Sequence, residues 1–201
     1  MSAPKGNARK QILQAALKQF AANGYAGASV RNIVAETPFT QPTLYYYFRN
    51  KAALYKALLD LAHDECYERM QAAAARHREF PAQLVETVVA LFKTVREKRD
   101  LMRLAFVSAF AAPKEIPPEA RTVTLVKGKR NLAFVESLIR QAQARQALTP
   151  AFNSTELAYA LYSALTFEVM RFLLEPQKPL NRRRAERLVA LFLQGALPRN
   201  R

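Results

Sequence analysis

The chain has 201 residues and half of them are apolar, so it can form one large domain or a small domain joined to a larger one. Lysine and arginine number 31 against 16 acidic residues, and the resulting charge of +15 favours a polyanionic partner such as nucleic acid or an anionic membrane surface. The single cysteine excludes an intrachain disulfide, and no uninterrupted apolar run reaches the ~18 residues of a membrane span. The first ten residues lack the apolar segment of a secretion signal, so we expect a soluble, cytoplasmic protein.

The composition favours helix nearly throughout, because glycine is rare and Ala, Leu, Gln, Glu, Lys and Arg are abundant. We therefore predict an all-α fold of about nine helices. A small, basic unit of three helices with a helix-turn-helix forms residues 1–50, and a larger helical body forms residues 51–201.

The first predicted helix covers residues 5–22, and the Asn23-Gly24 pair that follows it is a natural helix stop. Ser29 can cap a short second helix, which Pro38 ends because proline cannot continue the hydrogen-bond ladder. The first helix carries one apolar stripe, made of Ile12, Leu13, Ala16, Leu17 and Phe20.

Thr40 can cap a third helix, with Pro42 in the first turn, where its missing N–H costs little. Leu44 and Phe48 are four residues apart and share its inward face. The three tyrosines at 45–47 are adjacent and point about 100° apart, so they cannot all face one core. Part of this aromatic surface must face outward.

The rest of the chain is predicted to form six helices, the first of which is capped by Asn50. Asn153 and Glu156 have the spacing of a capping box at the start of another. Proline-containing segments separate the later helices. The six helices cover residues 51–78, 81–97, 100–112, 117–145, 154–174 and 181–196.

Two short helices joined by a tight turn, with a first helix packed across them, predict a helix-turn-helix whose second helix enters the major groove of DNA. Gln41 offers an amide that can bond bidentately to adenine. Pro42 and Thr43 can add an apolar contact and a hydroxyl. Tyr45 and Tyr46 carry hydroxyls on rigid stems that can reach phosphate oxygens.

The N-terminal quarter concentrates the positive charge. Residues 1–51 hold seven lysines and arginines against one acid, Glu36, so they carry +6 of the total +15. Lys51 lies at a predicted helix N-terminus, where a phosphate would be favoured. A solvated surface is the alternative explanation of such a charge run.

The stretch RKQILQAALKQFAANGYAGASVRNIVAETPFTQPTLYYYFRNKAALYKALL, residues 9–59, resembles the DNA-binding segment of the tetracycline-repressor (TetR) family of bacterial transcription regulators. The motifs NGY, SVRNI, TLYYYF and NKAALY fall in the family's order and spacing. Two positions depart from it: Pro38 stands near the usual glycine of the turn, and Tyr47 stands where histidine is common. Beyond residue 60 only the helical pattern and the length fit.

The resemblance implies a regulator, most often a repressor, that binds a palindromic operator in double-stranded DNA as a homodimer and is released by a small-molecule inducer. It assigns backbone contacts to Ser29 and Arg31, with Arg31 extending toward a base. It places the segment from Thr40 to Thr43 in the major groove. Tyr45, Tyr46 and Lys51 would hold phosphates.

The helices predicted at 154–174 and 181–196 are apolar over more than one stripe, which favours burial against both a core and a partner subunit. An internal helix of a monomer is the alternative. Ligand binding would shift the population of states through the long helix at 51–78.

The inducer site implied by the resemblance lies in the body, where aromatic and methionine residues could equally be plain core. Arg103 and Glu168 interrupt apolar segments and could orient a ligand or pair with each other. The apolar candidates for lining this site are Phe92, Met102, Phe106, Phe110, Phe134, Tyr162 and Phe167.

Other classes of protein fit less well. The two histidines, His63 and His77, lie about 21 Å apart on one predicted helix and cannot share a catalytic site. His63 and Cys66 share a helix face, but no further metal ligands stand out. With no phosphate loop or nucleotide fingerprint, we expect no enzyme, metal or cofactor. A sequence-blind nucleic-acid binder and a basic membrane-surface protein remain as alternatives.

Overall fold

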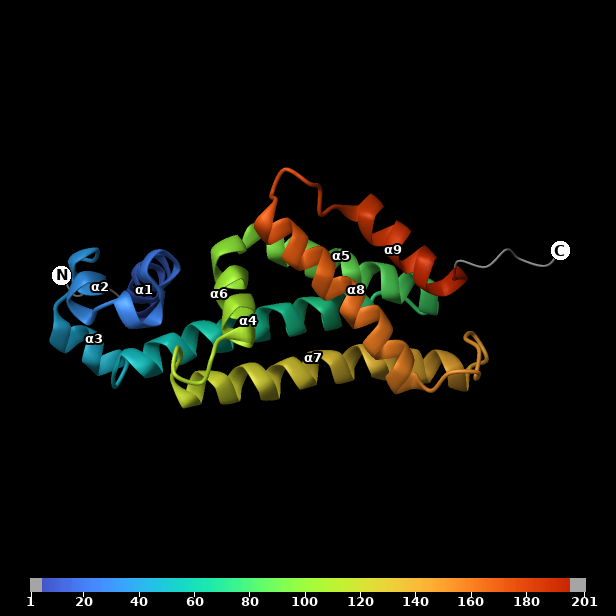
Figure 1. Ribbon diagram of the computed structural model, residues 1–201, viewed down its shortest axis with the longest axis horizontal. Helices are drawn as coiled ribbons and strands as arrows, with labels where there is room; N and C mark the ends of the chain where they lie inside the picture. The colour runs from blue at the N-terminus through green and yellow to red at the C-terminus, as the bar shows by residue number, and fades with distance from the viewer. Residues whose placement is uncertain (1–4, 196–201) are drawn as a thin grey trace. The chain divides into compact units, whose positions relative to one another are not determined.

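The computed structural model describes residues 5–195, and within this range the protein consists of nine α-helices joined by short loops (Figure 1). The predicted all-α fold is confirmed. The helices are α1 (Lys5–Gly27), α2 (Val30–Ala35), α3 (Gln41–Tyr47), α4 (Lys51–Ala74), α5 (Phe80–Glu97), α6 (Arg99–Phe110), α7 (Pro118–Ala144), α8 (Ser154–Leu174) and α9 (Arg182–Gln194).

Most predicted helix ends lie within a few residues of the observed ones. The first helix is an exception, since it reaches Gly27 through a break at Gly24, whose φ of 66° only glycine adopts readily. The fourth ends at Ala74 rather than at residue 78, because the N–H of His77 turns back to the carbonyl of Ala74. The last residue of the predicted helix 181–196 lies outside the described residues.

The chain divides into two compact units. The first unit combines residues up to 64 with residues 100–128, and the second combines residues 65–99 with those from 129 onward. Helices α4 and α7 each contribute to both units. The first unit therefore holds α1, α2 and α3, whereas α5, α8 and α9 belong to the second.

In the first unit, α1, α2 and α3 form a cluster around one apolar core (Figure 1). The predicted stripe of α1 supplies Ile12 and Phe20, and both are buried. Ile33 of α2 and Leu44 of α3 are fully buried against them. Each such side chain contributes about 1.5–3 kcal/mol relative to its exposed state.

In the second unit, α5 packs along α9 and against α8 (Figure 1). Leu84, Val88 and Phe92 are spaced four residues apart on α5 and are all buried. Arg182 of α9 donates two hydrogen bonds, of 2.6 and 2.9 Å, to the carboxylate of Glu86 on α5. The apolar stripe and this bidentate pair together fix α9 on α5.

The predicted capping box starts α8. The side chain of Asn153 accepts a hydrogen bond from the backbone N–H of Glu156, and the Glu156 carboxylate accepts one from the N–H of Asn153, both at 2.9 Å. Of the helices in the described range, α8 alone is long and apolar enough to cross a membrane, and 39% of its most apolar stretch is buried in the protein. Core helices of soluble proteins have the same length and composition.

Candidate nucleic-acid interface

The turn between α2 and α3 is held by side chains that bond to nearby backbone. Ser29 caps α2 as predicted, since its Oγ accepts a hydrogen bond of 3.1 Å from the N–H of Asn32. The hydroxyl of Thr37 donates to the carbonyl of Val34 at 2.9 Å and accepts from the N–H of Phe39 at 3.3 Å. Pro38 lies inside this bonded turn, between Thr37 and Phe39.

Helix α3 is anchored on its inner face and open on its outer face. Leu44 has no exposed surface and Phe48 is almost completely buried, as their spacing predicted. Thr40 precedes the helix, but its hydroxyl bonds to the hydroxyl of Thr43 at 3.1 Å instead of capping a backbone N–H. Thr40 is therefore the N-cap residue of α3, as predicted, but its side chain makes no capping bond, because the first-turn proline removes one of the available donors.

The residues predicted to face DNA are mostly accessible. Gln41 and Pro42 are exposed and Thr43 is half-buried. Tyr45 is 48% exposed and Tyr46 is 71% exposed, which confirms that part of the aromatic surface faces outward. The outer surface of α3 thus presents an amide, hydroxyls and two phenols, the groups that suit base edges and phosphates.

Arg31 of α2 is exposed, beside the half-buried cap residue Ser29. Thr40 is exposed at the start of α3. The two short helices thus bring every predicted groove and backbone contact except Lys51 onto the segment from residue 29 to residue 46.

Lys51 has partners other than the predicted phosphate. Its ammonium donates to the carbonyls of Tyr25 at 2.8 Å and Ala28 at 2.9 Å, and more weakly to that of Ala26 at 3.4 Å. It also lies over the ring of Tyr25, 4.5 Å from the centroid. Lys51 therefore satisfies carbonyls left open where α1 ends, a role that the sequence spacing of more than twenty residues concealed.

An aromatic cluster braces the start of α4 against α1 and α6. The ring of Tyr55 packs edge-on against Phe20 and Tyr25, with centroids 4.8 and 5.1 Å away. Its hydroxyl lies 2.8 Å from the Oγ of Ser108, and both residues are buried. Because Ser108 donates its only hydrogen to the carbonyl of Leu104, Tyr55 is the donor. Burial raises the pKa of Tyr55, so the phenol stays protonated and able to donate.

Sequence reasoning did not single out this cluster. Tyr55 lies in the NKAALY motif, which was the available signal, but its partner Ser108 is 53 residues away.

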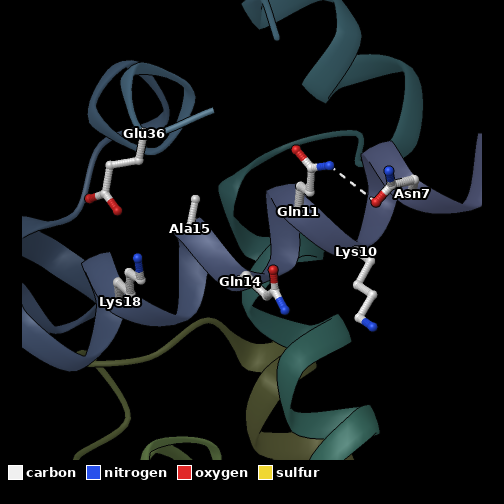
Figure 2. Close-up of a pocket in the computed structure, with 7 residues that line it drawn as sticks. All are labelled: Asn7, Lys10, Gln11, Gln14, Ala15, Lys18 and Glu36. Carbon is white, nitrogen blue, oxygen red and sulfur yellow. Dashed lines mark hydrogen bonds between the residues drawn. The ribbon is translucent and has the colours of Figure 1, made fainter. Parts of the chain in front are cut away.

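The outer face of α1 carries an open polar hollow of about 470 Å³ (Figure 2). Figure 2 shows Glu36, which follows α2, across from the side chains of α1, and a hydrogen bond from Gln11 to Asn7 along α1. The carboxylate of Glu36 also accepts a hydrogen bond from Gln19 of α1. The hollow is lined by Asn7, Lys10, Gln11, Gln14, Ala15, Lys18 and Glu36. Its two lysines add to the positive charge of the first unit.

The residues predicted to line an inducer site differ widely in burial. Phe92 and Met102 are buried, while Phe106, Phe134 and Tyr162 are half-buried. Burial raises the pKa of Tyr162 to about 12. Phe110 and Phe167 are exposed, at 74% and 58%.

Arg103 and Glu168 do not pair with each other. Arg103 is exposed on α6. Glu168 is 4% exposed, and its carboxylate accepts from Arg171 at 2.7 Å and from the Nε of Arg184 at 2.8 Å, with a further short bond from Arg184. Arg184 and then Arg171 lower the pKa of Glu168. The buried charge thus has a structural partner set that joins α8 to α9.

Comparison with known proteins places this geometry in a family. The profile described as "Bacterial regulatory proteins, tetR family" matches residues 12–58. The transcriptional regulator YdgC of Bacillus subtilis is 26% identical over 198 residues, covering 95% of this chain and 93% of YdgC. UidR of Escherichia coli K12 is 28% identical, covering 81% and 79% of the two chains.

Solved structures agree on the fold. FadR from Bacillus halodurans superposes with a TM-score of 0.81 at 19% identity, over 99% of this chain and all of that one. FadR from Bacillus subtilis, solved with stearoyl-CoA, gives 0.79 at 18% identity, over 94% and 99%. The relatives are transcription regulators, which confirms the prediction of a regulator instead of an enzyme. The chain belongs to the TetR family of bacterial transcription regulators, and its α2–turn–α3 segment is the family's DNA-binding helix-turn-helix.

Proposed function

We propose that the protein is a cytoplasmic repressor that binds a palindromic operator as a homodimer and leaves it when a small-molecule inducer binds. Residues 1–50 would read DNA, and residues 51–201 would bind the ligand and the second subunit. The observation that carries the proposal is the outer surface of α3, where Gln41, Tyr45 and Tyr46 are exposed around a fully anchored Leu44.

In this proposal α3 lies in the major groove. Gln41 reads a base, most simply adenine, and Thr43 and Pro42 contact neighbouring base edges. Tyr45 and Tyr46 donate to phosphates and set the register of the helix on the duplex. The remaining contacts to the DNA backbone come from Ser29, Arg31 and Thr40. Lys51 contributes indirectly, because its ammonium hydrogen-bonds to the backbone carbonyls at the end of α1.

A second copy of the chain is the proposed cover for the exposed apolar face of α8. Tyr159, Phe167 and Leu174 lie on one stripe of this helix and are more than half exposed. Leu191 adds an exposed apolar side chain on α9. Isologous pairing through α8 and α9 would bury these residues and place two α3 helices on two half-sites. It also accounts for the apolar length of α8 without a membrane.

The proposed inducer acts by population shift, since it must prefer one of two arrangements to change operator affinity. Helix α4 begins at the DNA-reading helices and continues into the second unit, so it can carry such a change. Stearoyl-CoA, the compound in the FadR complex, is a practical first compound for titration.

Selection of bound duplexes from a random pool, at near-physiological salt, tests the proposal. Two inverted half-sites about one helical turn apart are the expected result. The sequence-blind alternative, favoured by the charge of +15, predicts tight and salt-sensitive binding with no enriched sequence. Light scattering during gel filtration would test the dimer, and Phe167→Arg should yield monomers.

A further inference from the structure

Asn131 on α7 is the exception among the buried polar side chains. It is 4% exposed, and its side-chain oxygen Oδ1 has no hydrogen-bond partner within residues 5–195. The other buried polar residues of this range are all bonded. The hydroxyls of Thr87, Thr94, Ser108 and Thr124 donate to the carbonyl four residues earlier, and Glu168 accepts from two arginines.

Four other buried side-chain nitrogen or oxygen atoms in this range also lack a hydrogen-bond partner, but they do not weaken this contrast. They belong to Glu65, Arg171, His63 and Arg130, and each of these side chains has other partners. Between residues 5 and 195, Asn131 is the one buried side-chain amide whose acceptor lacks a partner. A buried acceptor without a bond loses its hydration on folding and gains no bond in return, so its presence calls for an explanation.

Most neighbours of Asn131 on its side of α7 are apolar or aromatic, and one, Arg130, is charged. Val135 and Leu138 follow on the same face of α7 and are buried. One turn from Asn131, the ring of Phe134 packs edge-on against Tyr67 of α4, with centroids 5.8 Å apart. Arg130 covers the Tyr67 ring at 4.1 Å. Because Arg130 lies over the Tyr67 ring, the acceptor of Asn131 is left among mainly apolar groups, and it suits a molecule that is mostly apolar and carries one donor.

We propose that Oδ1 of Asn131 accepts a hydrogen bond from the regulatory ligand, and that this ligand is a mainly apolar molecule with an O–H or N–H donor. The inference rests on the proposed ligand response and assigns one residue and one chemical class to it. Sites that read a donor in this way discriminate strongly against analogues that lack it, because the protein acceptor is then left unpaired. The free protein tolerates that unpaired acceptor in return for specificity.

Thermal unfolding of the full chain gives the first test. Leucine branches at Cγ as asparagine does, so Asn131→Leu removes the orphaned amide with little change of shape. We expect its Tm to rise by about 2–4 °C, the shift that corresponds to about 1 kcal/mol in a chain of this size. Thr94→Val, which removes a buried hydroxyl that is already bonded, is the matched control and should not raise the Tm. A fall in Tm for Asn131→Leu would overturn the proposal, since it would show an amide satisfied by buried water.

Ligand chemistry is tested with benzyl alcohol and ethylbenzene, which differ only in a hydroxyl against a methyl group. Binding is followed by NMR of backbone amides, which wild type and variant both retain, and the Asn131 side-chain amide of the wild type, assigned by its loss in Asn131→Leu, reports whether the probe reaches it. The ratio of benzyl alcohol to ethylbenzene affinity should fall about tenfold from wild type to variant, equivalent to 1.4 kcal/mol. An unchanged ratio, or a wild type that binds neither probe, would overturn the inference.

These outcomes separate the inference from the proposed function. An operator complex that no small molecule dissociates would contradict the ligand response, whatever the probes do at Asn131. Conversely, an operator complex that responds to a ligand while the probe ratio stays unchanged would leave the repressor intact and remove Asn131 from its ligand site.

Discussion

The two compact units differ in how their surfaces relate to their sequences. In the first, the residues proposed to meet DNA lie within the 18 residues from Ser29 to Tyr46, and local turns and caps set their directions. In the second, buried groups come from helices far apart in sequence, as in the pairing of Glu168 with Arg184 or Arg182 with Glu86. A site built from local geometry can be recognised in a sequence, whereas one built by packing cannot.

Leu44→Ala should have the largest effect and would break the first unit. It removes a fully buried side chain that anchors α3, so we expect a loss of about 2–5 kcal/mol in unfolding free energy and no operator binding. Denaturant unfolding and DNA binding measure the two effects.

Tyr46→Ala on the same helix is the matched control. Its side chain is 71% exposed, so stability should change by no more than about 0.5 kcal/mol while DNA affinity falls. Equal destabilisation by both variants would show that the outer face of α3 supports the fold and is not free for DNA.

The same contrast explains what the sequence could predict. The spacing of Leu44 and Phe48, the outward tyrosines and the cap at Ser29 follow from helical period and turn chemistry, and the structure confirms them. The roles of Lys51 and Glu168 do not, because each depends on a partner brought near by folding. The exposure of Phe110 and Phe167 could not be predicted for a related reason: an aromatic residue in a helix does not reveal which side it faces.

Glu168→Gln should have the next largest effect, now on the second unit. Since Arg184 and Arg171 lower the pKa of Glu168, the carboxylate stabilises the fold above its unfolded pKa near 4.5 and loses this contribution as pH falls through the lower folded value. The arginines are partly exposed, so we expect about 1–3 kcal/mol at neutral pH.

The pH profile makes this prediction specific. Unfolding followed from pH 7 downward should show the difference between wild type and Glu168→Gln shrinking below the unfolded pKa. Glu186→Gln on α9, an exposed partner of Arg182 at 3.7 Å, serves as the control and should change stability little at any pH. A pH-independent difference would assign the effect to packing.

Gln41→Ala and Tyr45→Phe sharpen the comparison within the interface itself. Loss of the amide should relax the preference at one base pair by about 1–3 kcal/mol, whereas loss of the phenol hydroxyl should weaken all duplexes equally. Selection from random duplexes, repeated with each variant, measures both. An unchanged selected sequence for Gln41→Ala would refute its assignment as a base reader.

The smallest expected effects concern the brace between α4 and α6. Tyr55 donates to Ser108, which already donates to Leu104, so the two ends of this bond are not equivalent. Tyr55→Phe removes the donor and leaves Ser108 bonded, which should cost about 0.5–1.5 kcal/mol. Ser108→Ala instead leaves a buried phenol hydroxyl without a partner and should cost more.

The double variant should therefore be no less stable than Ser108→Ala alone, because it removes the unpartnered hydroxyl. Unfolding of all three variants checks this order; equal costs would mean that the Tyr55 hydroxyl finds water when Ser108 is absent, and that the brace is packing alone.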